Sequence, residues 1–186
     1  MPDSADPIAE LAATDAAKRN LAAHWFYRRG CQLAVRATQL WREDQAFAAL
    51  LEGLPTVGIA VHPQTFERIR MANGAPRLAD VPPDQDAKEF ELHCKDAQLD
   101  ILTTRDPGGS GAIAKFLDKF GEGIQQVEYF VRDVDRATEI LRTRLHIQPI
   151  YPQTRAGADG TRVNFFLAAD PPGQKVLIEL VQKAGA

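Results

Sequence analysis

The pattern of hydrophobic and polar positions changes near residue 53. From Asp15 to Leu51 the chain has no proline and one glycine, and apolar side chains recur at helical spacing. This pattern predicts one long helix, or two helices broken near Gly30. We therefore expect an N-terminal helical arm over residues 1–52, which covers either the rest of the chain or a partner subunit.

The remainder, residues 53–186, shows the same order of elements twice. Short β-branched runs and helical segments predict two tandem βαβββ modules, residues 54–104 and 123–182, joined by a linker helix at 112–120. The expected fold class is α+β, with the modules forming curved sheets around a cavity. Strands are expected at 56–61, 75–81, 88–94, 98–104, 123–131, 147–151, 162–168 and 175–182, and helices at 63–71 and 134–145 behind an Asp133 cap.

Composition limits the possible classes of protein but does not identify a function. The chain has 186 residues, 45% hydrophobic and 25% charged, with no run near the roughly 20 apolar residues of a membrane span and no secretory leader in its acidic start. Cys31 and Cys94 form no motif, so we expect a cytoplasmic protein. The net charge of −3 argues against nucleic acid, although the basic residues between 15 and 43 could hold an anionic ligand.

Side-chain alternation separates each strand into two faces. One face is continuously apolar and should lie under helices. The other mixes small, polar and acidic groups: Thr56, Asp100, Gln126, Glu128 and Glu179. If this face lines a concave sheet, its carboxylates converge where general acid and base catalysis is favoured. The alternative is a solvated sheet face, but Glu179 lies in an aliphatic strand where an idle carboxylate is unusual.

Histidines do not form a metal motif. His24, His62, His93 and His146 have neither HxH nor HxxxH spacing, and a surface or core position is the simpler interpretation of each. His93 alone lies in a predicted strand from which it could face the cavity, so it is a candidate substrate-binding residue. Nucleotide hydrolysis is excluded because the glycine-rich segment 108–111 lacks the lysine and spacing of a phosphate-binding loop.

Several segments resemble methylmalonyl-CoA epimerases of the vicinal oxygen chelate superfamily, the glyoxalase, bleomycin-resistance and dioxygenase group. The resemblance rests on residues 110–117, read as Ser-Gly-Ala-Ile-Ala-Lys-Phe-Leu, on Gly-Glu-Gly-Ile at 121–124, and on 131–135 and 173–180. It covers roughly residues 54–182 and leaves the arm without a counterpart. The resemblance implies a two-module domain around a small-molecule site.

The resemblance also implies a divalent metal held at four positions, which in this chain are Thr56, Asp100, Gln126 and Glu179. The family's two histidine ligands would then be replaced by Thr56 and Gln126. A hydroxyl, an amide and two carboxylates suit a hard ion such as Mg²⁺ better than Co²⁺ or Zn²⁺. We therefore expect no tightly bound cofactor and at most a weakly bound divalent ion.

Three hypotheses follow for this chain. The first is a metal-independent isomerase, cyclase or lyase acting beside the carbonyl of an acyl thioester or polyketide-like substrate. Glu179 would be the base, Glu128 or Asp100 the acid, and Thr56 and Gln126 the donors to the oxyanion. The second is a non-catalytic protein that sequesters a small molecule, and the third is an assembly partner acting through the arm. A homodimer without membrane or nucleic-acid partners is expected.

Overall fold

The computed structural model describes residues 6–171 and 173–185. The first five residues and Pro172 lie outside this range, so the expected absence of a leader concerns residues that are not described. The described chain is mixed α and β and divides into two compact units. One comprises Met1–Arg29 with Thr56–Gln125, and the other Gly30–Pro55 with Gln126–Ala186. Each unit contains one of the predicted modules and part of the predicted arm.

The arm is helical but breaks elsewhere than expected. Helix α1 covers Pro7–Glu10, α2 Ala16–Ala37, α3 Gln39–Glu43 and α4 Gln45–Ala48. Gly30 is buried inside α2 and does not interrupt it. The break falls at Thr38, whose hydroxyl and backbone N–H both donate to the Ala34 carbonyl, at 2.8 and 2.9 Å. A second break follows at Asp44, whose carboxylate caps α4.

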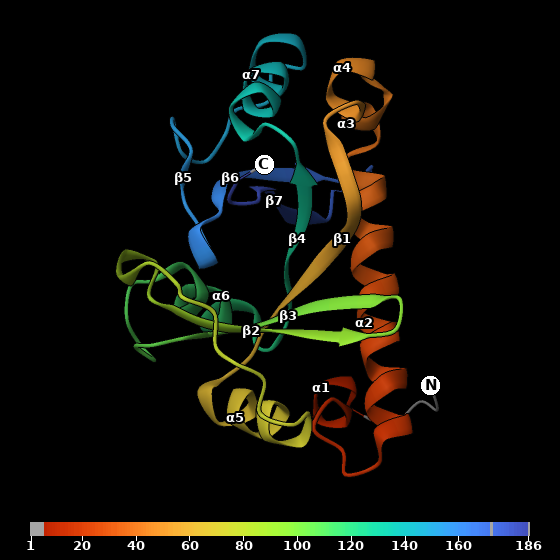
Figure 1. Ribbon diagram of the computed structural model, residues 1–186, viewed down its shortest axis with the longest axis vertical. Helices are drawn as coiled ribbons and strands as arrows, with labels where there is room; N and C mark the ends of the chain where they lie inside the picture. The colour runs from red at the N-terminus through yellow and green to blue at the C-terminus, as the bar shows by residue number, and fades with distance from the viewer. Residues whose placement is uncertain (1–5, 172, 186) are drawn as a thin grey trace. The chain divides into compact units, whose positions relative to one another are not determined.

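In the first unit, three strands pair in the order β2-β3-β1. Strand β1 (Leu51–Ala60) runs parallel to β3 (Ala97–Thr104), and β3 pairs antiparallel with β2 (Ala87–Cys94), as the adjacent strands in Figure 1 show. Helix α5 (Pro63–Ala72) follows β1, and α6 (Ala112–Phe120) ends at Gly121, whose φ of +72° suits glycine. The hairpin and both helices are predicted correctly, whereas β1 begins five residues earlier than expected.

The second unit repeats this pairing. Strand β4 (Gly123–Val131) runs parallel to β7 (Lys175–Gln182), and β7 pairs antiparallel with β6 (Arg162–Ala169). Helix α7 (Val134–Arg144) follows β4 and begins at the predicted Asp133 cap, which accepts from the Arg136 backbone N–H at 2.9 Å. Because both units join their first and last strands in parallel, the internal repeat is confirmed. Short 3₁₀ turns occur at Pro83–Gln85 and Ala158–Gly160.

Two predicted strands are absent from the described residues. Residues 75–81 are irregular because Gly74 and Ala75 both have positive φ and Pro76 lacks an N–H; only Ala79 N–H bonds to the neighbouring strand, at Glu89 O. Residues 147–151 likewise make a single such bond, from Ile150 N–H to Phe165 O at 2.7 Å. The two-residue strand β5 (Arg155–Ala156) takes the outer position beside β6 instead.

Aromatic packing joins parts of the arm to the unit that contains them. In the second unit, the Trp41 ring lies 5.7 Å from Phe166 and 6.0 Å from Phe47, both edge to face. In the first, Asn73 at the end of α5 donates to Leu11 O at 3.0 Å and accepts from Arg19 Nε at 3.2 Å. The arm therefore supplies core and hydrogen bonds to each unit. The domain boundaries 1–52 and 53–186 stay a prediction.

The predicted apolar face is buried throughout. In the second unit its side chains are at most 6% exposed, and in the first they are fully buried. The members are Val57, Ile59, Val61, Ile101, Val127, Tyr129, Val131, Val176, Ile178 and Leu180. Strand alternation therefore assigned this face correctly, which fixes the candidate site residues on the opposite one.

Candidate functional site

Three candidate residues of the second unit lie together on one sheet face. Gln126 and Glu128 are two residues apart on β4, and strand register places Glu128 beside Glu179 of β7. The Gln126 amide nitrogen donates to Glu179 Oε2 at 2.5 Å and to Glu128 Oε1 at 3.2 Å. Because an amide NH₂ carries two hydrogens, this one group bridges two carboxylates.

Although they are polar, the three residues are largely shielded from water. Gln126 is 7% exposed and Glu179 is 9% exposed, while Glu128 is half-buried. Buried carboxylates require hydrogen-bond donors, and Gln126 supplies one to each. The strands β4 and β7 hold these groups in fixed relative positions, because ladder bonds on both sides of Glu179 set its register.

Aromatic side chains lie around this group on the same face. Phe165 of β6 is in register with Glu179, and its ring lies 6.0 Å from that of Tyr151. The Arg155 guanidinium stacks 4.5 Å over the Tyr151 ring, and Lys183 Nζ lies 4.7 Å from the Phe130 ring. The face that carries Gln126 and the two carboxylates therefore also carries the apolar rings of Phe130 and Phe165.

The remaining candidate residues belong to the first unit. Asp100 on β3 is 7% exposed and in register with Gly58, so it shares a sheet face with Thr56, which is 6% exposed. His93, by contrast, is exposed at the end of β2 and its Nε2 lies 3.1 Å from Glu91 Oε2. The substrate-binding role of His93 stays a prediction, and this exposed contact with Glu91 does not support it.

No family model matches this sequence, and no curated protein matches it significantly. Solved structures do match. The methylmalonyl-CoA epimerase of Mycobacterium tuberculosis is 35% identical, covering 73% of this chain and 90% of that one with a TM-score of 0.59. The chain belongs to the methylmalonyl-CoA epimerase family. This membership confirms the family resemblance and the α+β fold class expected from the sequence.

Two further matches in the family carry ligands. A point variant of the Streptomyces coelicolor methylmalonyl-CoA epimerase, in complex with 2-nitronate-propionyl-CoA, is 27% identical over 73% of this chain and 97% of that one, with a TM-score of 0.57. A methylmalonyl-CoA epimerase in complex with methylmalonyl-CoA and NH₄⁺ is 26% identical over 73% and 95%, with a TM-score of 0.54. These epimerases are therefore the solved structures with which the candidate site is compared.

The four positions that the resemblance assigns to metal ligands fit a transition metal poorly. They offer oxygen donors and an amide, whereas Co²⁺ and Zn²⁺ favour imidazole nitrogen. In the second unit, the Gln126 amide donates hydrogen to Glu179 at 2.5 Å, so it meets that carboxylate as a donor and not as a fellow ligand. Within the described residues, no three His, Cys, Asp or Glu side chains are grouped as a metal site.

Sequence reasoning did not find the aromatic and cationic groups beside the carboxylates. Tyr151 and Arg155 lie in an irregular segment and a two-residue strand, where alternation assigns no face. The pocket beside α7 was also not predicted from the sequence. No helix in the described part of the chain is long and apolar enough to cross a bilayer.

Proposed function

We propose that this protein catalyses proton transfer at the carbon next to the carbonyl of an acyl-CoA thioester, an isomerase-type reaction. Glu179 is the base and Glu128, on the same sheet face of the second unit, is the acid. The observation that carries this proposal is the bridge from Gln126 to both Glu179 and Glu128, at 2.5 and 3.2 Å, on a shielded sheet face. Support for the substrate class comes from the epimerases that the chain resembles, which hold CoA thioesters.

The reaction needs a base that is ionised and fixed in position. The hydrogen bond from Gln126 stabilises the ionised form of Glu179 and orients it. Glu179 removes the proton at the α-carbon, leaving the electron pair delocalised onto the thioester oxygen as an enolate. A proton from a second carboxyl group returns to the same carbon from the opposite face, which inverts the centre and restores the thioester.

The enolate oxygen needs hydrogen-bond donors in place of an ion. Gln126 is the candidate donor in the second unit, through an amide hydrogen. Both hydrogens of the Gln126 amide are donated to carboxylates in this structure, so donation to an enolate requires release of one of them. The longer bond to Glu128 is the weaker of the two and is the one we expect to be released.

Isotope exchange tests this proposal. Methylmalonyl-CoA and propionyl-CoA are incubated with the full chain in D₂O, with and without a chelator, and deuterium at the α-carbon is measured by mass spectrometry. We expect exchange that survives chelation and falls at least about 100-fold in Glu179→Gln, the range for loss of a general base. Glu67→Gln, an exposed carboxylate on α5, is the matched control.

Two results would overturn the proposal. Absence of exchange with both thioesters, with or without added Mg²⁺, Mn²⁺ or Co²⁺, would remove the isomerase assignment. Exchange that depends on an added ion would retain the chemistry but refute its metal independence. An equal loss in Glu67→Gln and Glu179→Gln would show that the effect does not come from the site.

The alternative is a non-catalytic protein that holds a small molecule on the same face. It is favoured by one observation, namely that the Glu179–Gln126 pair is already satisfied within the protein at 2.5 Å. It predicts that Glu179→Gln binds a non-exchanging acyl-CoA analogue as tightly as the unchanged chain, while neither shows isotope exchange. Calorimetry on both proteins separates these outcomes. Lyase or cyclase activity, a homodimer and a cytoplasmic location stay predictions.

A further inference from the structure

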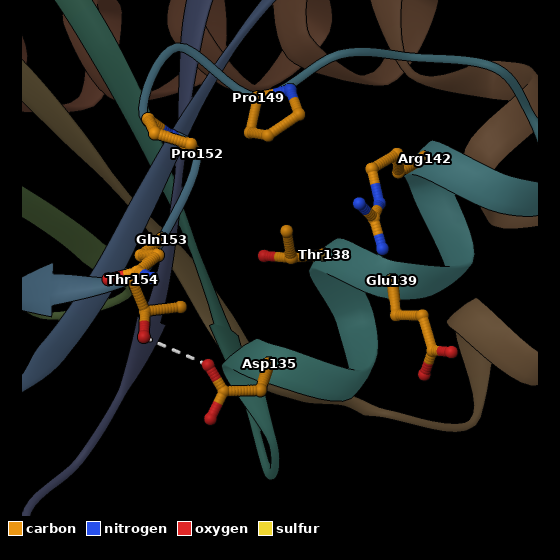
Figure 2. A pocket seen from close by; sticks show the side chains of 8 residues that line it. All are labelled: Asp135, Thr138, Glu139, Arg142, Pro149, Pro152, Gln153 and Thr154. Atoms are coloured by element: carbon orange, nitrogen blue, oxygen red, sulfur yellow. Dashed lines mark hydrogen bonds between the residues drawn. The ribbon is translucent and has the colours of Figure 1, made fainter.

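A pocket lies in the second unit, away from the residues proposed for catalysis. It has a volume of about 370 Å³, within the range of small-molecule sites. One wall is helix α7, which contributes Asp135, Thr138, Glu139 and Arg142. The opposite wall is the segment 149–154, with Pro149, Pro152, Gln153 and Thr154 (Figure 2). No residue proposed for the thioester reaction lines it.

The segment opposite α7 is held in place at several points. Ile150 N–H bonds to Phe165 O at 2.7 Å, and Asn164 Nδ2 donates to Tyr151 O at 3.3 Å. At its far end, the Thr154 hydroxyl donates to Asp135 Oδ1 at 2.8 Å, the bond drawn in Figure 2. Two prolines further restrict the backbone. The pocket is therefore preformed, which lowers the entropic cost of binding.

Both acids of the lining are already neutralised. Asp135 accepts from Arg162 at 2.6 Å, and this bond holds the pKa of its carboxyl below the ordinary value. Glu139 pairs with Arg136 at 2.7 Å, and Figure 2 shows its carboxylate pointing away from the 149–154 segment. Arg142 has no ion pair or hydrogen bond among the described residues. It leaves the pocket with one uncompensated positive charge.

Two further polar groups of the lining lack partners within the described range. The Thr138 hydroxyl oxygen is buried and unbonded, and the Gln153 amide makes no hydrogen bond. Figure 2 shows the Thr138 side chain lying between α7 and the opposite segment. Threonine in a helix has two common χ1 rotamers, so its hydroxyl can turn toward a ligand. An unbonded buried hydroxyl is energetically unfavourable, and a ligand that bonds to it would offset this cost.

We propose that this pocket binds a small organic anion through a carboxylate or phosphate group. The Arg142 guanidinium is the charged donor, because its fork matches either oxyanion. Gln153 and Thr138 add hydrogen bonds from opposite walls, and the rings of Pro149 and Pro152 contact the apolar part of the ligand. The site is a binding site separate from the thioester reaction.

Titration with simple anions followed by NMR tests the proposal. Propionate, succinate and inorganic phosphate are added separately to the ¹⁵N-labelled full chain. We expect saturable shifts at the amides of Thr138, Arg142 and Gln153, with a dissociation constant near or below about 1 mM for at least one probe. The probe that saturates identifies the group: propionate or succinate indicates a carboxylate, and phosphate a phosphoryl group.

Matched variants separate a site from general charge attraction. Arg142→Gln should weaken binding at least about tenfold, and Arg142→Lys by less, because lysine keeps the charge but loses the fork. Lys88→Gln, which removes one exposed charge in the first unit, should have no effect. Thr138→Val should weaken binding while keeping the side-chain shape.

Three outcomes overturn the proposal. The first is that no probe saturates up to about 50 mM, well above the expected millimolar range. The second is that Lys88→Gln and Arg142→Gln weaken anion binding equally. The third is that the shifts are confined to the strands that carry Gln126 and Glu179. Since no turnover is measured, failure here leaves the proposed isomerase reaction untouched.

Discussion

Replacing Tyr129 with phenylalanine removes one hydroxyl that joins the arm to the sheet of the second unit. Tyr129 is 6% exposed, and its Oη lies 3.0 Å from Thr38 Oγ1. The Thr38 hydroxyl already donates its hydrogen to Ala34 O at 2.8 Å, so Tyr129 is the donor in the pair. The loss of one buried hydrogen bond, with the Thr38 donor still satisfied, should lower the free energy of unfolding at pH 7 by about 1 kcal/mol.

This difference should depend on pH. Burial raises the pKa of Tyr129 above its ordinary value, against smaller opposing effects of Thr38 and Arg42. Because the folded state holds this proton more tightly than the unfolded state, the stability involved is complete below about pH 10 and is lost as pH rises through the higher folded pKa. Phenylalanine has no proton to lose. The stability difference between the two proteins should therefore shrink above about pH 10.

Urea unfolding of the full chain at pH 7 and at about pH 10.5, monitored by tryptophan fluorescence, measures both effects. Tyr151→Phe is the control, because no hydrogen bond of its hydroxyl occurs among the described residues and the ring contact with Phe165 is retained. The reasoning is refuted if Tyr129→Phe matches the unchanged chain at pH 7, or if their difference is the same at both pH values.

Three further predictions concern the second unit. Asp133→Ala removes the cap of α7 and should cost about 1 kcal/mol in thermal or urea unfolding, whereas Asp133→Asn should retain most of it. Phe166→Ala empties a fully buried position beside Trp41 and should cost about 3–5 kcal/mol; a loss under about 1 kcal/mol would contradict the packing. Gln126→His should raise Co²⁺ affinity in calorimetry, and Gln125→His, on the other face of β4, should not.

Alternation within a strand could be predicted because it is local. The spacing of Val127, Tyr129 and Val131 alone assigned them to a buried face, and the structure confirms it. The two predicted strands that are absent fail for the opposite reason. Residues 75–81 and 147–151 each make one backbone–backbone bond to a neighbouring strand, from Ala79 and Ile150. Whether such a segment joins a ladder depends on backbone geometry, which cannot be read from its composition.

The candidate site was predictable as a set of residues but not as a network. Parity placed Gln126, Glu128 and Glu179 on one face, yet Gln126 and Glu179 are 53 positions apart, and the sequence does not specify the register between their strands. The pocket beside α7 shows the same limit. Asp135, Thr138 and Arg142 have helical spacing that is visible in the sequence, but the neutralisation of Asp135 by Arg162 depends on a contact across 27 positions.

The hydrogen bonds of the Gln126 amide bear on both the metal-dependent and the metal-independent reaction. An imidazole at this position could offer a metal a lone pair, whereas an amide NH₂ offers hydrogens, and both are directed at carboxylates. We propose that with an amide at this position Glu179 is held by a neutral hydrogen-bond donor and serves as a base in place of a metal ligand. A base in that state can act without an ion, provided that the enolate takes over one amide hydrogen. Because the bond to Glu128 is 0.7 Å longer than the bond to Glu179, from 3.2 and 2.5 Å, we propose that Glu128 is released first and that its protonated form returns the proton.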